Sequence, residues 1–157
     1  MSQMNLEKAC MDHVIKEKWL CIESVCFYHD ISTTLNSLPL KDHTFKYIER
    51  NFVQVSKTSN FNEMRVQCVA NLASSSHLQV EHKLEIGSAI SRWVNHSKIE
   101  RQKFSFWLLK HVRAYKLVIE KLQEDLAKGH SFYSYTMCKW IEDLIDEITQ
   151  KDRDGKI

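Results

Sequence analysis

The chain has 157 residues, 43% of them hydrophobic and 27% charged, with 22 lysines and arginines against 20 aspartates and glutamates. This balance argues against intrinsic disorder, and the mixed charges include no basic block that would follow a nucleic-acid backbone. No segment approaches the roughly 20 apolar residues of a membrane span, and the N-terminus lacks the apolar stretch of a signal peptide. We therefore expect a globular intracellular protein that binds neither nucleic acid nor membrane.

Three glycines and one proline leave few sites for the tight turns of a multi-stranded β fold, so the composition predicts helices. The length suits one domain with a core that needs no disulfides. Five cysteines, an odd number at irregular spacing, predict free thiols in a reducing compartment, the cytoplasm or the nucleus. We predict one all-α domain over residues 1–150 and a charged, frayed tail over 151–157.

The first predicted elements are two amphipathic helices within residues 6–29, separated by the polar residues 16–18. Their apolar positions at helical spacing are Leu6, Cys10, Val14, Leu20, Ile22, Val25 and Cys26. Residues 32–37 are rich in serine, threonine and asparagine, whose side chains favour caps and turns. An irregular loop is predicted there.

The next predicted helix has Pro39 in its first turn, where the missing N–H has no intrahelical partner. Its buried stripe consists of Leu40, Thr44, Tyr47, Ile48 and Phe52. The apolar run 53–55 leads into capping residues, so it predicts a turn and a short helix instead of a strand. Another short helix is predicted over 66–72, and the small residues 73–76 end it.

The second half of the chain predicts helices over 81–96, 104–112, 117–126 and 135–148, with Gly129 as a C-terminal cap. Gly87 costs about 1 kcal/mol of helix propensity and predicts close packing by a neighbour. In total we expect about seven to nine helices joined by short loops, which is typical of stacked antiparallel helical hairpins.

Trp93 and Trp107 fall on the apolar faces of their helices, so we predict that both are buried. For Trp19, at a helix junction beside charged residues, core or edge packing is expected, and a partner anchor is the alternative. The last helix has acidic residues largely opposite its apolar stripe, which predicts a solvated face and not a paired-carboxylate site. These residues are Glu142, Asp143, Asp146 and Glu147.

Motifs for chemistry are missing from the sequence. It contains no phosphate-binding loop, no nucleophile elbow and no metalloprotease helix. The one metal-like grouping, Cys21, Cys26 and His29, lacks the paired short spacings and the fourth ligand of a zinc site. We expect no catalytic residue, cofactor or metal, and a small helical enzyme or zinc protein is the competing class.

Two stretches carry longer sequence patterns. Residues 45–61 read as a helix ending Y-I-x-x-N-F that runs into x-x-V-S-x-T-x-x-F, and residues 89–113 contain A-V-x-R-W-V-x-H, E-R and L-L-x-H-V-R in that order, with Ile90 at the second position. These stretches resemble the BACK domain of BTB-Kelch proteins, with the family's separation between the motifs, and the likeness covers residues near 5 to 120. The positions that form this structural motif are Tyr47, Ile48, Phe52, Val55, Phe61, Ala89, Trp93, Val94, His96, Leu108, Leu109, Val112 and Arg113. The loop 32–37 looks like an insertion, and 114–116 stands where the family has L-P-L.

The resemblance implies the helical BACK fold and a part in a cullin-3 RING ubiquitin-ligase adaptor. In that family, BACK follows a BTB domain that dimerises and binds cullin-3, and it precedes a Kelch propeller that holds the substrate. The implied partners are therefore cullin-3, through an adjoining BTB domain, and a Kelch-bound substrate.

By the same resemblance, residues 6–29 correspond to the family's 3-box, the helical pair that supports the cullin contact. Its implied protein-binding positions are Cys10, Val14, Trp19, Leu20 and Ile22. The alternative is a stand-alone helical interaction protein with a BACK-like fold that does not engage a cullin.

Overall fold

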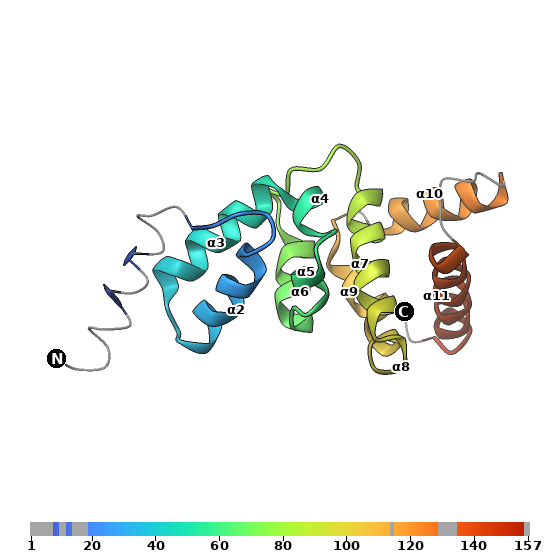
Figure 1. Cartoon of the computed structure of the whole chain (residues 1–157). Helices are drawn as coiled ribbons and strands as arrows, with labels where there is room; N and C mark the ends of the chain where they lie inside the picture. Colours follow the sequence, from blue (N-terminus) through green and yellow to red (C-terminus); the bar gives the residue numbers. More distant parts are fainter. Residues whose placement is uncertain (1–7, 10–11, 14–18, 114, 129–134, 156–157) are drawn as a thin grey trace. The chain divides into compact units, whose positions relative to one another are not determined.

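The computed structural model describes residues 8–9, 12–13, 19–113, 115–128 and 135–155, and the regular elements in these ranges are all helices (Figure 1). The prediction of an all-α fold is confirmed. The elements are α2 (Val25–Thr34), α3 (Leu38–Arg50), α4 (Phe52–Val55), α5 (Ser59–Asn62), α6 (Val66–Ser74), α7 (Leu84–His96), α8 (Lys98–Arg101), the 3-10 helix η1 (Gln102–Phe104), α9 (Ser105–His111), α10 (Tyr115–Ala127) and α11 (Tyr135–Arg153).

These helices form two compact units, and the boundary between the units falls within α6. The described residues up to Cys68, together with His77–Gln79, belong to unit 1. Val69–Ser76 and the described residues from Val80 onward belong to unit 2. Each unit is described by itself, and the predicted single domain over 1–150 stays a prediction.

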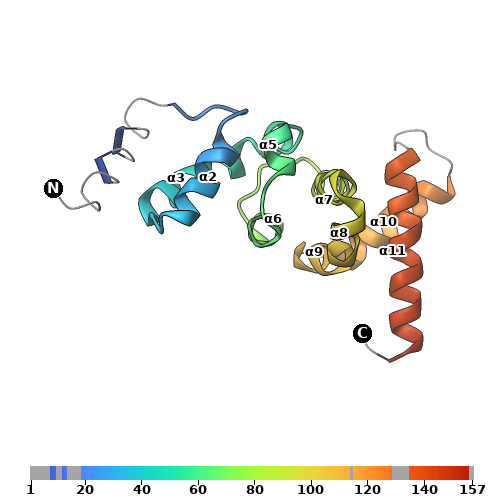
Figure 2. The same ribbon diagram turned by 60° about the horizontal axis from the view of Figure 1, so that its bottom comes forward.

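Unit 1 is built on a hairpin in which α2 packs along α3 (Figure 2). Asn36 makes the turn between them with a left-handed φ of 51°, a conformation that asparagine tolerates better than most residues. Ser37 caps α3 by accepting a hydrogen bond from the backbone N–H of Leu40 at 3.4 Å, and Pro39 occupies the first turn as predicted. The hydrophobic residues buried in this unit are Val25, Cys26, Leu40, Ile48, Phe52, Val55, Phe61, Met64 and Cys68.

Helix α2 lies later in the sequence than predicted. Residues 21–24 form a turn in which the Ser24 hydroxyl accepts from the Cys21 N–H, so the helix begins only at Val25. The helix then continues to Thr34, and the prediction of an irregular loop from residue 32 is wrong over its first half. The Ser32 and Thr34 hydroxyls donate to carbonyl oxygens of the preceding turn, which satisfies them inside a helix. Most of the first predicted helix lies outside the described residues.

The short apolar run after α3 is helical, as predicted. Residues 52–55 form α4, and Thr58 then caps α5 by accepting from the Phe61 N–H at 3.3 Å. The Phe52 and Phe61 rings meet edge to face with their centroids 6.2 Å apart. Both side chains are buried, so this pair closes the core of unit 1 around two single-turn helices.

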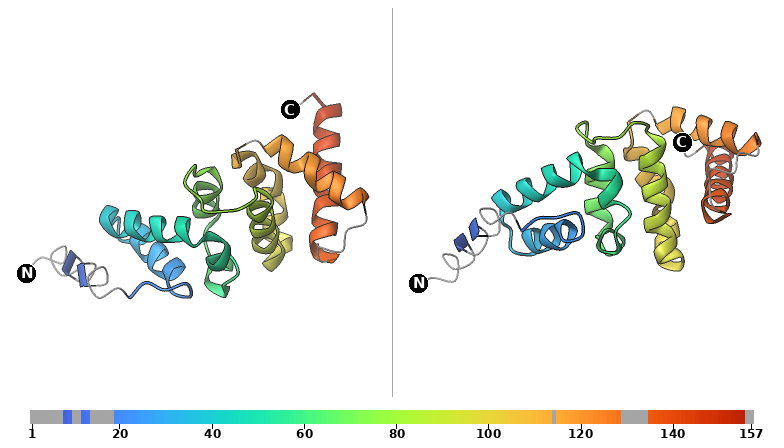
Figure 3. Two further views of the ribbon diagram at one scale, coloured as in Figure 1. Left: turned by 90° about the horizontal axis from the view of Figure 1, so that it is seen from above. Right: turned by 45° about the horizontal axis from the view of Figure 1, so that its top comes forward.

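Unit 2 packs α7, α9, α10 and α11 against one another (Figure 3). Its buried hydrophobic residues are Val69, Ala70, Leu72, Ala73, Ile86, Ala89, Ile90, Trp93, Val94, Phe106, Leu108, Leu109, Val112, Val118, Trp140, Ile141 and Leu144. The predicted burial of Trp93 is confirmed, but that of Trp107 is wrong, since 41% of Trp107 is exposed. Because α9 is short and its inward face is filled by neighbouring residues, Trp107 lies outside and contacts the His111 ring at 4.4 Å.

Two details of unit 2 also differ from prediction. A Cβ at Gly87 would lie 3.9 Å from Val118 Cγ1, an ordinary contact, so the neighbour is not as close as predicted. Helix α11 continues three residues into the segment expected to fray, to Arg153. The Lys151 ammonium pairs with Glu147 one turn earlier at 2.6 Å, which extends the helix. The predicted cap Gly129 lies outside the described residues.

Candidate protein-interaction surfaces

The predicted groove of the first helical pair is described only in part. Cys10 and Val14 lie outside the described residues. Trp19 is 51% exposed and its ring meets the His13 ring edge to face at 4.9 Å, while Leu20 and Ile22 are half-buried. Trp19 therefore packs at the edge of the unit with about half of its surface exposed. That Cys10, Val14, Trp19, Leu20 and Ile22 together form a groove stays a prediction.

An uncovered apolar face lies on α2 of unit 1. Phe27, Ile31 and Leu35 are spaced four residues apart, so they share one side of the helix. Phe27 is 56% exposed and Leu35 is 38% exposed, whereas Val25, Cys26 and His29 on the other side are buried. This α2 face, defined by Phe27, Ile31 and Leu35, is a surface of the kind that proteins use for contacts. The helical periodicity of the sequence predicted the buried positions Val25 and Cys26 but not this exposed face.

The family-like motif positions are mainly core residues. Those that the structure buries are Ile48, Phe52, Val55, Phe61, Ala89, Trp93, Val94, Leu108, Leu109 and Val112. Tyr47 is half-buried, and His96 and Arg113 are exposed. The motif therefore records how the helices pack.

A cleft of about 460 Å³ opens on unit 2 between α11 and the α8–η1 segment. Val94, Trp140 and Leu144 contribute apolar surface to it, and all three are buried. Ile99 on α8 also lines the cleft, yet 99% of its surface is exposed. We name this feature the α8–α11 cleft.

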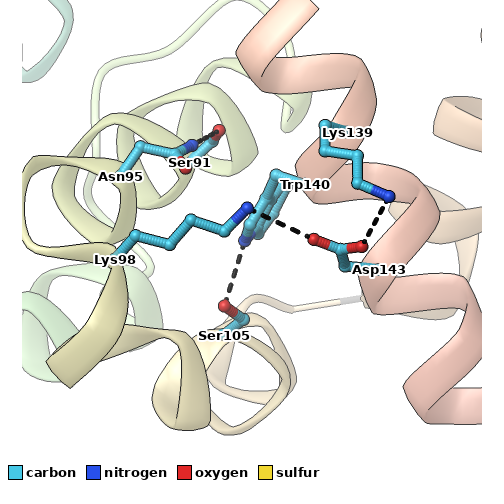
Figure 4. A network of polar contacts seen from close by, with 7 residues as sticks. All are labelled: Ser91, Asn95, Lys98, Ser105, Lys139, Trp140 and Asp143. Carbon is cyan, nitrogen blue, oxygen red and sulfur yellow. Dashed lines mark hydrogen bonds and ion pairs between the residues drawn. The ribbon is translucent and has the colours of Figure 1, made fainter.

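The charged walls of the α8–α11 cleft are linked by one shared carboxylate. Asp143 on α11 lies 3.5 Å from the Lys98 ammonium of α8 and 3.2 Å from that of Lys139 on its own helix (Figure 4). Glu147, one turn further along, pairs with Lys151. Two of the four acidic residues predicted to face solvent, Asp143 and Glu147, are therefore half-buried and line the cleft, while Glu142 and Asp146 are exposed.

Trp140 fixes the position of α11 beneath this cleft. Its indole N–H donates to the Ser105 hydroxyl oxygen at 3.1 Å, as Figure 4 shows, and both residues are almost fully buried. Since a buried indole N–H without an acceptor is costly, the bond defines where α11 lies on α9. Sequence alone left the environment of Trp140 open.

A second, more apolar cleft of about 400 Å³ lies between the start of α7 and α10. Leu84, Leu117 and Val118 line it, and Leu117 is 66% exposed. Lys83 and Lys121 stand at its edge with Glu81. It is a further candidate contact surface.

Burial holds His29 and the Cys26 thiol of unit 1 in their neutral forms. Burial, with a smaller contribution from the Lys41 charge, lowers the pKa of His29 to about 4. The ring Nδ1 lies 2.8 Å from Thr44 Oγ1, whose own hydroxyl donates to the Leu40 carbonyl at 2.9 Å. Burial, with help from the Asp30 carboxylate, raises the pKa of the Cys26 thiol to about 12. A neutral imidazole and a protonated thiol sealed in the core are structural groups.

Two negative findings apply to the part of the chain that the structure describes. No three histidine, cysteine, aspartate or glutamate side chains gather there as metal ligands. Within the same ranges, none of the helices combines the length and apolarity needed to cross a bilayer.

The sequence matches a family model, BACK, described as BTB And C-terminal Kelch, over residues 25–127. It is 30% identical to human Kelch repeat and BTB domain-containing protein 3 over 135 residues, which is 85% of this chain and 21% of that protein. The mouse protein of the same name is 26% identical over 143 residues, 91% of this chain and 23% of the relative. Human Kelch-like protein 2 is 30% identical over 93 residues, 59% of this chain and 16% of the relative. The chain thus spans about a fifth of the length of these relatives.

Proposed function

Because this chain belongs to the BACK family, we propose that it is the BACK scaffold of a BTB-Kelch substrate adaptor for a cullin-3 RING ubiquitin ligase. The observation that carries the proposal is the match over residues 25–127, which takes in the helices from α2 to α10. The relatives' names add BTB and Kelch parts to a protein about four times as long.

A scaffold of this kind works through shape and contacts, without catalysis. The motif residues lie in the core, and the buried His29 and Cys26 are held neutral, which supports a structural role. We propose that the adaptor acts in the cytoplasm or nucleus. Cys21, Cys26, Cys68 and Cys138 are free thiols, in keeping with a reducing compartment.

We assign the contact with an adjoining BTB domain and cullin-3 to unit 1. Trp19 and the α2 face are exposed and apolar, and Trp19 and Phe27 lie within residues 6–29, the stretch that resembles the 3-box. Tryptophan and phenylalanine are the side chains that most often anchor protein interfaces. The substrate is then bound elsewhere, by a Kelch propeller.

The test is a pull-down of purified cullin-3 by the full chain fused behind a BTB domain. Recovery of cullin-3 is expected, and Trp19→Ala should lower the affinity at least about tenfold if Trp19 anchors the contact. Leu117→Ala, which removes an exposed apolar residue from unit 2, should leave recovery unchanged.

Circular dichroism must show that both variants keep their helix content. If the fused protein recovers no cullin-3, the chain is instead a stand-alone interaction protein with a BACK fold. If both variants weaken recovery equally, Trp19 is not the anchor.

A further inference from the structure

Positive charge is concentrated in one stretch of unit 2. Residues 101–119 hold five of the 22 lysines and arginines and none of the 20 aspartates and glutamates, whereas the whole chain has a net charge of only +2. The five cations are Arg101, Lys103, Lys110, Arg113 and Lys116. Such a local excess favours a partner of opposite charge wherever the cations are exposed.

Part of this stretch forms the outer side of η1 and α9. Lys103, Trp107 and Lys110 follow one another at intervals of four and three residues, so they lie on one side of the helical segment, and all three are exposed. Phe104 and His111 lie at the same intervals from Trp107 and are half-buried. We name this side, defined by Lys103, Phe104, Trp107, Lys110 and His111, the α9 face.

The α9 face has an apolar centre that is open to solvent. Trp107 is 41% exposed, and its ring meets two neighbouring rings edge to face, with centroids 4.4 Å from His111 and 6.4 Å from Phe104. The His111 Nδ1 also donates to the Trp107 carbonyl oxygen at 2.8 Å, which fixes the imidazole against the helix. The three rings therefore form a preformed surface that a partner side chain can cover without rearranging them.

The two lysines of the α9 face are held beside rings and not beside carboxylates. Lys103 Nζ lies 5.2 Å from the centroid of the Phe104 ring, and Lys110 Nζ lies 5.3 Å from that of Phe106. Among the residues that the structure describes, neither lysine has an ion-pair partner. A cation–π contact uses one side of an ammonium group and leaves its other N–H bonds for an incoming carboxylate.

The acids of the neighbouring helices do not cancel this charge. Helix α11 packs against α9, but its half-buried carboxylates, Asp143 and Glu147, pair with lysines of α8 and α11. Glu100 on α8 is exposed and forms no ion pair with Lys103 within the described ranges. The two lysines thus give the α9 face a formal charge of +2, and the exposed Arg113 adds a third cation just beyond it.

From these observations we propose that the α9 face binds an acidic segment of another protein. An apolar residue of the segment covers Trp107 and Phe104, and carboxylates on either side of it pair with Lys103 and Lys110. A nucleic acid is less well matched, because neither cleft of unit 2 described above reaches Trp107 and no groove follows the face for a strand to occupy. An anionic membrane is less well matched because the Trp107 ring is packed between two others and is not free to enter a bilayer.

The test is fluorescence anisotropy of short fluorescein-labelled peptides titrated with the full chain. One peptide has a central leucine flanked by glutamates, and a second has the same leucine flanked by lysines. The glutamate peptide should bind saturably, at least about tenfold tighter than the lysine peptide, and more weakly as salt is added. Serine in place of the leucine should weaken binding severalfold, because the apolar contact is lost.

Matched charge variants locate the binding. Lys103→Glu/Lys110→Glu should weaken the glutamate peptide at least about tenfold, since it places like charges opposite each other. Lys57→Glu/Lys83→Glu makes the same change in net charge at exposed positions outside the α9 face and should have no such effect. Circular dichroism checks that both variants keep their helix content.

A matched pair of tryptophan variants tests the apolar centre. Trp107→Ala should weaken the glutamate peptide severalfold. Trp19→Ala removes a tryptophan of similar exposure from unit 1 and should leave this binding unchanged. Since Trp19 is the residue assigned to the cullin-3 contact, the two proposals can fail separately.

Four results would overturn the proposal. The first is no saturable binding of the glutamate peptide, and the second is equal weakening by the two charge variants, which would show only a general charge effect. The third is tighter binding to an oligouridine or to phosphatidylserine vesicles that Lys103→Glu/Lys110→Glu abolishes, which would assign the face to a nucleic acid or a membrane. The fourth is self-association that the same variant abolishes, in which case the occupant is a second copy of this chain.

Discussion

Arg101 holds the C-terminal part of α7 through the backbone and the side chain of Trp93 at once. Its Nη1 donates to the Trp93 carbonyl oxygen at 2.8 Å, and its guanidinium carbon lies 4.1 Å from the centroid of the Trp93 ring. The carbonyl belongs to the last turn of α7, where helical carbonyls begin to lack partners within the helix. One side chain thus caps a helix end and covers a buried indole.

Replacement of Arg101 should therefore destabilise unit 2. Arg101→Ala removes a charged hydrogen bond and a cation–π contact, and we expect a loss of about 2–3 kcal/mol in the free energy of unfolding. Arg101→Lys keeps the positive charge but lacks the planar guanidinium, so its loss of unfolding free energy should be smaller than that of Arg101→Ala but not zero. Urea denaturation followed by tryptophan fluorescence measures both. Arg113→Ala, at an exposed motif arginine, should stay within about 0.5 kcal/mol of the parent, and an equal loss there would contradict this role for Arg101.

Two tryptophans of unit 2 should respond very differently to alanine. Trp93 is 2% exposed and Trp107 is 41% exposed. Trp93→Ala leaves a large cavity and should cost about 3–5 kcal/mol, enough to unfold a marginal domain. Trp107→Ala should cost about 1 kcal/mol or less, because its contacts are with His111 and Phe104 at the surface. Thermal melts by circular dichroism distinguish the two, and a cooperative, equally stable Trp93→Ala protein would show that α7 is misplaced.

The free energy of unfolding should decrease as the pH is lowered, because the folded protein keeps His29 unprotonated. The folded pKa of about 4 lies below the ordinary 6.5, so below pH 6.5 the unfolded chain binds a proton that the folded chain does not. The stabilisation is complete above about pH 7 and decreases through pH 6.5 toward 4, by about 3 kcal/mol in all.

The check compares the pH dependence of unfolding for the parent and for His29→Gln, in which the amide can still donate to Thr44. The difference between the two curves isolates His29 from carboxylates such as Asp30, whose pKa is raised by burial. Parallel curves between pH 4 and 7 would mean that the imidazole is reached by water.

Gly87 is a position where the protein can be made more stable. It lies inside α7 and has room for a methyl group against Val118. Gly87→Ala should add about 0.5–1 kcal/mol by lowering the backbone entropy of the unfolded chain. Gly87→Val, whose extra atoms extend toward Val118, should remove that gain. If Gly87→Ala is destabilising in urea titrations, α10 lies closer to α7 than the 3.9 Å contact indicates.

The helices of the chain were predictable where local signals agreed. Ser37 and Pro39 mark the start of α3, and the capping residues around Thr58 correctly favoured a short helix over a strand. Trp93 was predictable as core because α7 is long enough for its periodicity to define one buried face. The first half of 32–37 was misread because serine and threonine hydroxyls can bond back within a helix as well as end it.

The candidate sites needed the fold. The α8–α11 cleft joins Lys98 and Asp143, which lie far apart in the sequence, and periodicity ranks residues on one helix only. Trp107 was misplaced because a helix of two turns presents an ambiguous face. Ile99 offered the one readable signal, a lone isoleucine within the charged stretch 98–101.

The bond from Trp140 to Ser105 gives the C-terminal helix a single register. An apolar helix can shift along an apolar surface with little change in buried area. Here, any shift would leave the buried indole N–H of Trp140 without a hydrogen-bond acceptor, which would cost about 1–3 kcal/mol. A substitution that removed the hydroxyl, such as Ser105→Ala, would leave the helix bound but free to occupy neighbouring positions. The Trp140–Ser105 hydrogen bond therefore fixes the position of α11 along its own axis. The shape of every surface to which α11 contributes depends on that bond.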